Sequence, residues 1–383
     1  MFVLIISRGF PSLQDVMIGN FEADQARALY ALGHKVVVLS IDRRLKAHDR
    51  HIGFNHRVID GIDVYNFYMF PMPIKTMYKL GYFYIVQMVR FLYRIILRNH
   101  GRPDIIHAHY LYTMPIALKL KDLFNVPCVG TEHWSFLGKS VMPVFVRFYA
   151  ERIYHRLDAL ITVSNSLGMN IRKQFGVKSC VIPNMLDVSK FNINAQSKFN
   201  RGKANFSFIS VGALVDGKCF DLLLKAFSRL KFENKYLTIV GDGPKKHYLK
   251  NLIIELGIEK CVEFTGKLSR EEMLPKLSYS NVFVLPSNSE TFGVVYIEAM
   301  ALGLPVIATK CGGPEDFVDS SNGLLIERNS EERLVDAMEY MYKHYNEYKR
   351  ESISGSVINR YSPSKIARQI ELLRSEERRV GKE

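Results

Sequence analysis

The chain has 383 residues, a length that predicts two domains. Its composition, with 48% hydrophobic and 23% charged residues, is typical of a soluble globular protein. The formal net charge of +14 indicates a phosphate-bearing partner: a nucleotide, a nucleic acid or an anionic membrane. The five cysteines are scattered without a C-x-x-C pair, which argues against a disulfide framework or a zinc site and fits a reducing cytosol.

The N-terminal segment begins with a buried strand rather than a signal peptide. Residues 2–7 form a continuous β-branched and aliphatic run, too short and without the basic start that a signal peptide needs. Helical spacing follows over 21–32, and a second apolar run over 35–40 predicts another strand. The loop between the first strand and the helix contains Gly19, at a place where open α/β sheets bind ligands.

Residues 78–98 are dense in aromatic and aliphatic side chains, but Arg90, Arg94 and Arg98 recur along one helix face. The charges make this segment a poor membrane-spanning helix. It is either a core helix with a solvated basic edge or a helix lying on an anionic membrane. A second basic and aromatic segment, residues 139–156, adds to the membrane interpretation.

Three histidines lie at or just after the ends of predicted strands in the first half. His107 and His109 end a strand at 103–109 and face the same side because they are two residues apart. A metal site is conceivable there, but no third ligand has suitable spacing. His133 follows a short strand at 126–131 and is either a packing residue or a weaker candidate of the same type.

The second half repeats the strand and helix alternation, with strands at 206–211 and 236–240 and a helix at 220–230. The loop after its first strand carries Gly212 and Lys218. We interpret Lys218 as either a solvated loop lysine or a phosphate ligand.

Further loops of the second half carry glycines and basic residues. Gly243 lies in a Gly-Asp-Gly-Pro turn that opens a helix, a weak phosphate-loop signal on its own. Lys267 and Leu268 close the segment 262–268, and Gly313 lies in a Gly-Gly-Pro-Glu loop.

The stretch 288–309 organises the second half. A buried strand at 282–285 leads into a loop with Glu290, and a helix from about residue 294 carries Glu298 one turn in. The amides at this helix start have no intrahelical partner, carry partial positive charge and bind phosphate well. They belong to Phe292, Gly293 and Val294. An anion site flanked by two carboxylates suits a nucleotide-sugar.

The run S-E-T-F-G-x-x-x-x-E-A-M-A-x-G-x-P-V-I-A-T in this stretch resembles the E-x7-E signature of family-four retaining glycosyltransferases. The resemblance covers most of the chain and is densest over 206–325. It implies an α/β protein of the GT-B architecture, with two Rossmann-like doubly wound domains facing across a cleft. The first domain would bind the acceptor, and the second would bind the nucleotide-sugar.

The resemblance also implies the domain limits. The segment Ile-Pro-Asn-Met-Leu-Asp at 182–187 matches the family's interdomain segment, so we predict domains at 1–184 and 185–362. The polar stretch 192–203 would be a surface linker. Residues 363–383 would be a helix crossing back to the first domain, and its charge-dense end from residue 374 would be a disordered or non-native tail.

The resemblance assigns roles to the candidate residues. Glu298 would accept hydrogen bonds from ribose hydroxyls, and Glu290 would hold the sugar. Lys218 and the helix-start amides would stabilise the leaving diphosphate, and His109 would contact the sugar from the first domain, with His107 structural. The remaining donor-side candidates are Gly19, Gly212, Gly243, Lys267 and Leu268, with His133 and Gly313 as secondary ones.

The chain departs from the family pattern at four positions. Ala213 stands where a diphosphate-binding arginine is usual, and removal of one such group typically lowers a rate by roughly a hundred to a thousandfold. Lys267 is a candidate replacement cation. Cys219 and Met185 replace usual glycines, and Ile18 precedes Gly19 where a glycine pair is usual.

The implied function is a metal-independent, retaining hexosyltransferase without a cofactor. It would transfer a hexose or N-acetylhexosamine from a UDP- or GDP-linked donor to a glycan or lipid-linked acceptor in polysaccharide synthesis. We expect a cytoplasmic protein, and residues 78–98 and 139–156 are the segments that would bring it to the inner membrane face. Two alternatives stay open: a nucleotide-sugar 2-epimerase-like enzyme and a catalytically weak nucleotide-sugar-binding protein. A nucleic-acid binder is disfavoured because the basic residues follow amphipathic helices rather than a nucleic-acid module.

Overall fold

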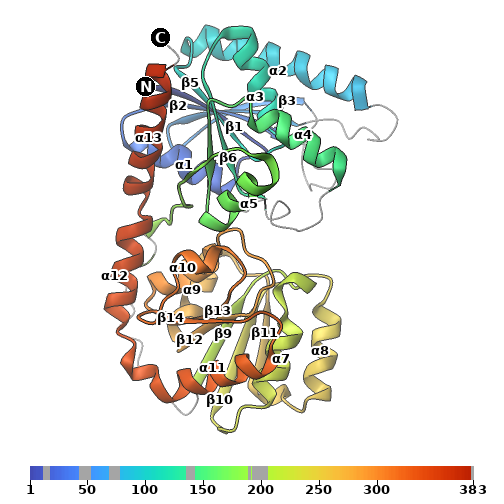
Figure 1. Ribbon diagram of the computed structural model, residues 1–383, viewed down its shortest axis with the longest axis vertical. Helices are drawn as coiled ribbons and strands as arrows, with labels where there is room; N and C mark the ends of the chain where they lie inside the picture. Colours follow the sequence, from blue (N-terminus) through green and yellow to red (C-terminus); the bar gives the residue numbers. More distant parts are fainter. Residues whose placement is uncertain are drawn as a thin grey trace. The chain divides into compact units, whose positions relative to one another are not determined.

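The computed structural model describes residues 1–11, 18–42, 53–68, 78–134, 143–188, 191 and 206–380. The chain divides into two compact units (Figure 1): unit 1 comprises residues 1–185 with 363–383, and unit 2 comprises 186–362. The boundary expected after residue 184 lies one residue from this division. The expected linker 192–203 lies outside the described residues.

Unit 1 is an α/β unit built on an eight-stranded sheet of order β3-β4-β2-β1-β5-β6-β7-β8. All neighbouring strands pair in parallel except β3 and β4. The strands are β1 (Phe2–Ser7), β2 (Lys35–Asp42), β3 (Gly53–Ile59), β4 (Ile62–Tyr68), β5 (Ile105–His109), β6 (Cys128–Glu132), β7 (Ala159–Thr162) and β8 (Cys180–Val181). The helices are α1 (Asn20–Ala31), α2 (Tyr78–His100), α3 (Met114–Phe124), α4 (Val144–Tyr154), α5 (Asn165–Phe175) and α13 (Pro363–Val380).

The β3–β4 hairpin was not predicted. Its connection, Asp60-Gly61, has both residues at positive φ, 53° and 78°. This geometry is typical of the tight turn that an Asp-Gly pair favours between antiparallel strands. The pair is therefore a signal in the sequence that locates this hairpin.

The C-terminal helix α13 differs from the expectation of a disordered end. The helix continues to Val380, and the side chain of Arg374 is buried against His107. Ile366 and Ile370 of the same helix join the apolar cluster that includes Val3 of β1. The prediction that the tail begins at residue 374 is therefore wrong for Arg374, because its side chain is buried on the same face of the helix as Ile366 and Ile370.

Helix α2 is a core helix along most of its described length. Val89, Leu92 and Ile96 are buried, whereas Phe91 and Arg94 are exposed. The apolar face of α2 therefore packs into the protein, which supports the core interpretation of this segment. Among the described residues, no helix is long and apolar enough to cross a membrane.

Unit 2 is an α/β unit whose six-stranded sheet has the order β11-β10-β9-β12-β13-β14, with every pair parallel. Its strands are β9 (Phe206–Val211), β10 (Lys235–Val240), β11 (Val262–Gly266), β12 (Val282–Leu285), β13 (Val306–Thr309) and β14 (Gly323–Ile326). Its helices are α7 (Phe220–Ser228), α8 (Lys246–Glu255), α9 (Arg270–Tyr279), α10 (Val294–Ala301), α11 (Glu331–His344) and α12 (Arg350–Tyr361). The doubly wound order that we predicted is confirmed.

Both sheets reverse their strand order at one point, between β1 and β5 in unit 1 and between β9 and β12 in unit 2. Loops that leave the two central strands diverge there and create a crevice at the carboxyl ends of the strands. Most of the predicted site residues follow these strands or their neighbours.

Candidate functional site

Glu290 lies in the loop after β12, beside the switch point of unit 2. Its carboxylate forms an ion pair with Lys218, which ends a short helix after β9, and accepts a hydrogen bond from Ser287 Oγ at 2.8 Å. Only 10% of the Glu290 side chain is exposed. The carboxylate is thus nearly buried and is held by two partners, Lys218 and Ser287. Ala213, in the same loop as Lys218, is exposed.

The backbone around Glu290 is tied to the loop after β13. The Glu290 amide donates to the Cys311 carbonyl at 3.0 Å, and the Gly313 amide donates to the Glu290 carbonyl at 2.9 Å. Gly313 also lies so close to Phe292 that a β-carbon at Gly313 would be 2.3 Å from the Phe292 carbonyl oxygen. Gly313 is therefore required for packing beside the predicted site.

Helix α10 begins where the sequence indicated. Gly293 is its N-cap with φ of 92°, a left-handed conformation that favours glycine. The first-turn amides, including that of Val294, have no partner within the helix. The Phe292 side chain points into the protein, with its ring 5.7 Å from that of Phe317 and 5.6 Å from that of Tyr361. Phe292 can therefore contact a ligand only through its backbone.

Glu298 is buried one turn into α10, and its partner is a residue that the sequence analysis missed. Arg270 Nε donates to Glu298 Oε1 at 2.8 Å, and a second guanidinium nitrogen contacts the same oxygen. Arg270 begins α9, which is capped by reciprocal hydrogen bonds between Ser269 and Glu272. The sequence Ser-Arg-Glu-Glu is a capping-box signal that locates this helix start.

The other donor-side candidates occupy the loops after β9, β10 and β11. Gly243 packs against the Leu214 backbone, since a β-carbon there would be 2.6 Å from the Leu214 carbonyl oxygen. Gly212 has no such restriction, because the atom nearest to a β-carbon there would be 3.7 Å away. Lys267 is exposed and Leu268 is partly buried, just before the cap of α9.

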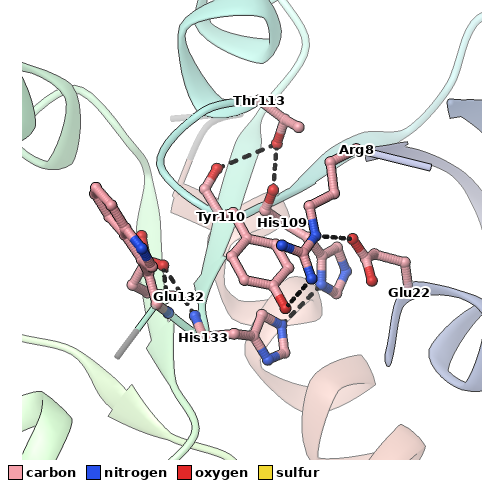
Figure 2. Close-up of polar contacts among 8 residues, drawn as sticks. Arg8, Glu22, His109, Tyr110, Thr113, Glu132 and His133 are labelled. Atoms are coloured by element: carbon pink, nitrogen blue, oxygen red, sulfur yellow. Dashed lines mark hydrogen bonds and ion pairs between the residues drawn. The ribbon is translucent and has the colours of Figure 1, made fainter. Parts of the chain in front are cut away.

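In unit 1, the histidine rings form a stack at the ends of β5 and β6. The rings of His107 and His109 lie 4.7 Å apart, and those of His109 and His133 lie 5.3 Å apart. His109 Nδ1 and His133 Nε2 are 3.1 Å apart and share a hydrogen bond (Figure 2). His107 Nε2 lies 2.6 Å from Thr131 Oγ1, and its other nitrogen lies 3.0 Å from the Gln25 amide.

Burial keeps these histidines neutral. It lowers the pKa of His107 and His109 well below the ordinary value, and neighbouring cationic groups lower it further. Burial and the Arg8 charge lower the pKa of His133 to about 3. His107, fully enclosed, is structural, whereas His109 Nε2 has no hydrogen-bond partner among the described residues.

A buried acid that was not predicted supports the stack. Glu132 accepts hydrogen bonds from the amides of Leu111, His133 and Trp134 at 2.9 to 3.0 Å and from the Tyr154 hydroxyl at 2.8 Å. Four donors therefore fix this carboxylate, which in turn fixes the backbone that carries His133. No pattern in the sequence separated Glu132 from an ordinary strand-end acid.

Gly19 is the N-cap of α1, with φ of 68°, and a β-carbon there would be 2.1 Å from the Gly9 carbonyl oxygen. The glycine thus allows the chain to pass close to Gly9. Within the part of the chain that the structure describes, no group of three or more potential ligands could hold a metal ion.

Two family models match the sequence. The model "Glycosyltransferase Family 4" matches residues 19–190, and "Glycosyl transferases group 1" matches residues 192–356. An uncharacterized glycosyltransferase of Methanocaldococcus jannaschii, MJ1178, is 30% identical over 59% of this chain and 62% of its own length. The chain thus spans about three fifths of that relative.

Two further proteins are similar along nearly the whole chain. TuaC of Bacillus subtilis, which its name provisionally assigns as a glycosyltransferase of teichuronic acid biosynthesis, is 28% identical over 92% of this chain and 91% of its own length. The structure of Anabaena HepE in complex with UDP and glucose superposes with a TM-score of 0.74, at 18% identity, over 98% of this chain and 99% of that one.

Proposed function

We propose that the chain, which a glycosyltransferase model matches in each half, is a retaining hexosyltransferase of the GT-B type. It transfers a hexose or N-acetylhexosamine from a nucleotide-sugar to a glycan or lipid-linked acceptor. The observation that carries this proposal is the pair of carboxylates, Glu290 and Glu298, held by Lys218 and Arg270 around the start of α10.

The donor binds along the loops of unit 2 after β9, β11 and β12. Glu298 accepts hydrogen bonds from ribose hydroxyls while Arg270 holds its carboxylate in a fixed orientation. Glu290, fixed by Lys218 and Ser287, holds a hydroxyl of the transferred sugar. The loop after β11, which carries Lys267 and Leu268, would hold the nucleobase, as the family resemblance implies.

The departing diphosphate lies at the helix start, on the amides of α10. The N-terminal end of a helix favours negative charge, and Lys218 adds a full positive charge nearby. These groups supply the stabilisation of the leaving group, so we assign neither a metal nor another cofactor to the reaction. The assignment of His109 to the donor sugar stays a prediction.

In this proposal the acceptor is a growing glycan or a lipid-linked intermediate of polysaccharide synthesis. The name of TuaC concerns a cell-surface polymer, and the HepE structure contains UDP with glucose, which supports a UDP-linked hexose as the first donor to test. A GDP-linked donor is the alternative.

We further propose that α4 rests on an anionic membrane. Val144 and Phe148, one turn apart, are 83% and 60% exposed. The guanidinium of Arg152 lies 5.5 Å from the centre of the Phe148 ring, and Arg147 is exposed beside it. Exposed apolar side chains flanked by arginines are suited to a surface with anionic headgroups.

Vesicle sedimentation tests the membrane contact. We expect the protein to sediment with vesicles containing phosphatidylglycerol but not with purely phosphatidylcholine vesicles, and Val144→Asp with Phe148→Asp to abolish sedimentation. The matched control is Ile254→Asp on α8, where the native side chain is 63% exposed. Equal sedimentation of both variants would contradict the proposal.

The enzymatic proposal is tested by incubating the protein with UDP- and GDP-hexoses and a panel of glycan and lipid-linked acceptors. NMR of the product should show the anomeric configuration of the donor retained. Reactions without acceptor separate the rival epimerase, which would alter the sugar by itself. Nucleotide binding without any turnover across the panel would favour the catalytically weak binding protein that Ala213 suggests.

A further inference from the structure

Arg8 is a partly exposed cation at the switch point of unit 1 that the proposed function has not used. It directly follows β1, and its neighbours come from the ends of β5 and β6 and from the first turn of α1 (Figure 2). Its guanidinium lies 3.7 Å over the centre of the Tyr110 ring, and Nη2 donates to the Tyr110 hydroxyl at 2.8 Å. Its side chain is nevertheless 46% exposed.

Tyr110 holds Arg8 in a defined place. Tyr110 is only 5% exposed, and it adopts φ of 64°, which is rare for an aromatic residue and costs about 1 kcal/mol or more. The Tyr110 ring also lies 4.8 Å from the His133 ring. The arginine is thus stacked on a rigid support instead of moving freely on the surface.

Glu22 offsets only part of the Arg8 charge. Its carboxylate is fully buried, and Oε1 lies 3.8 Å from Arg8 Nε, beyond hydrogen-bond distance. Burial raises the pKa of Glu22, although Arg8 and nearby backbone amides act in the opposite direction. His109 and His133 are neutral, so Arg8 is the exposed charge of this cluster.

We propose that Arg8 binds an anionic oxygen of the sugar acceptor, from a carboxylate or a phosphate, with Tyr110 as its positioning residue and Glu22 as a partial counter-charge. The inference rests on the proposed function and on the family resemblance, which implies that the first domain binds the acceptor. A guanidinium has five N–H donors in a planar fork that matches both anions. Only one of the five donates a hydrogen bond within the described part of the protein.

The two sources share this chemistry but differ in the acceptor that they imply. A carboxylate would come from an acidic sugar of the growing glycan, and a phosphate from a lipid-linked or phosphorylated acceptor. Glucuronate and inorganic phosphate are therefore the two test ligands, and glucose, which has the ring but no charge, is the control.

Isothermal titration of the full-length protein measures the binding of each. We expect saturable binding of glucuronate or phosphate, at least tenfold weaker in Arg8→Gln and unchanged in Arg172→Gln, which alters an exposed arginine of α5. The tighter of the two ligands identifies the source. Binding of neither anion, or equal binding of glucose, would overturn the proposal.

Substitution of Glu22 provides a test with the opposite sign. Glu22→Gln removes the nearby negative charge and should tighten anion binding severalfold, a gain that a merely structural role would not produce. Tyr110→Phe keeps the ring and removes the hydroxyl, so it should weaken binding less than Arg8→Gln does. Weaker binding in Glu22→Gln, with its fold intact by circular dichroism, would contradict the role of Glu22 as a partial counter-charge.

A second phosphate site in unit 2 is distinguished by Lys218→Gln. Phosphate binding that is lost in Lys218→Gln and kept in Arg8→Gln would belong to unit 2 and would count against the inference. Failure of nucleotide binding in unit 2, by contrast, would remove the proposed function while leaving an Arg8 anion site standing.

Discussion

The two units carry their candidate residues in opposite electrostatic states. In unit 2 each acid is paired with a cation, Glu290 with Lys218 and Glu298 with Arg270. In unit 1, burial without a counter-charge makes the histidines neutral. The same kind of sheet edge thus presents fixed charges on one unit and neutral hydrogen-bonding rings beside one arginine on the other.

Substitutions in the two units should therefore have different effects. In unit 2, a substitution that removes the charge of Glu290 or Glu298 leaves its lysine or arginine partner unpaired beside the donor. Sugar transfer or nucleotide binding should therefore be affected before stability is. In unit 1 a histidine substitution removes a neutral buried ring, so pH-dependent stability should change first.

The largest expected effect is that of Glu290→Gln. The variant keeps the shape of the side chain but removes the charge that pairs with Lys218, so transfer should fall by roughly a thousandfold. Nucleotide affinity, measured by calorimetry, should stay nearly unchanged, as in the control Glu332→Gln on the exposed face of α11. Loss of nucleotide binding together with transfer would sink the role assigned to Glu290.

The next effect concerns the packing beside Glu290. A β-carbon at Gly313 would be 2.3 Å from the Phe292 carbonyl oxygen, so Gly313→Ala should destabilise unit 2 by about 1–3 kcal/mol in urea unfolding. Gly217→Ala, where a β-carbon meets nothing within 4 Å, is the matched control. Equal stability of the two variants would show that the loops adjust without cost.

The pH dependence of stability tests the neutral histidines of unit 1. The pKa of His133 falls from 6.5 to about 3 on folding, so below pH 6.5 the unfolded chain binds a proton that the folded chain does not. Stability due to this group is therefore present above pH 6.5 and declines on acidification, by about 2 kcal/mol at pH 5.

His133→Asn should remove that dependence. Its loss of stability between pH 7 and pH 5 should be smaller than that of the native protein by about 2 kcal/mol. His247→Asn, an exposed residue of α8, is the control and should behave as the native protein does. Parallel pH curves for the native protein and His133→Asn would mean that His133 titrates normally.

The smallest effect is expected from Arg270→Gln. The variant loses the charged hydrogen bonds to Glu298, so nucleotide affinity should weaken by about tenfold. Arg229→Gln removes an exposed ion pair to Glu331 and should have no effect on that affinity. Tighter nucleotide binding in Arg270→Gln would reverse the account, since Arg270 would then compete with the ligand for Glu298.

Much of the fold could be predicted because its strands are continuous apolar runs. The predicted limits of 2–7, 206–211 and 282–285 are those of β1, β9 and β12. The hairpin β3–β4 was missed because the β3 side chains are mostly exposed and lack a buried pattern. Its Asp-Gly turn was the available signal.

The site was predictable only in part, because partners across loops leave no local pattern. Glu290 and Glu298 were found within one motif, but Arg270 lies 28 positions before Glu298. Arg8 and Tyr110 meet only because β1 and β5 are neighbours in the sheet, 102 positions apart in the chain. Burial, which sets the pKa of the histidines, likewise depends on the whole unit.

Thermal unfolding with UDP, GDP, ADP and their common sugars tests whether unit 2 binds a nucleotide-sugar at Glu298 and the start of α10. A ligand at a hundred times its dissociation constant should stabilise the protein by about 2.7 kcal/mol. We predict a clear shift with one nucleotide family, absent in Glu298→Gln and retained in Glu332→Gln. No shift with any nucleotide, or an equal shift in Glu298→Gln, would contradict the account.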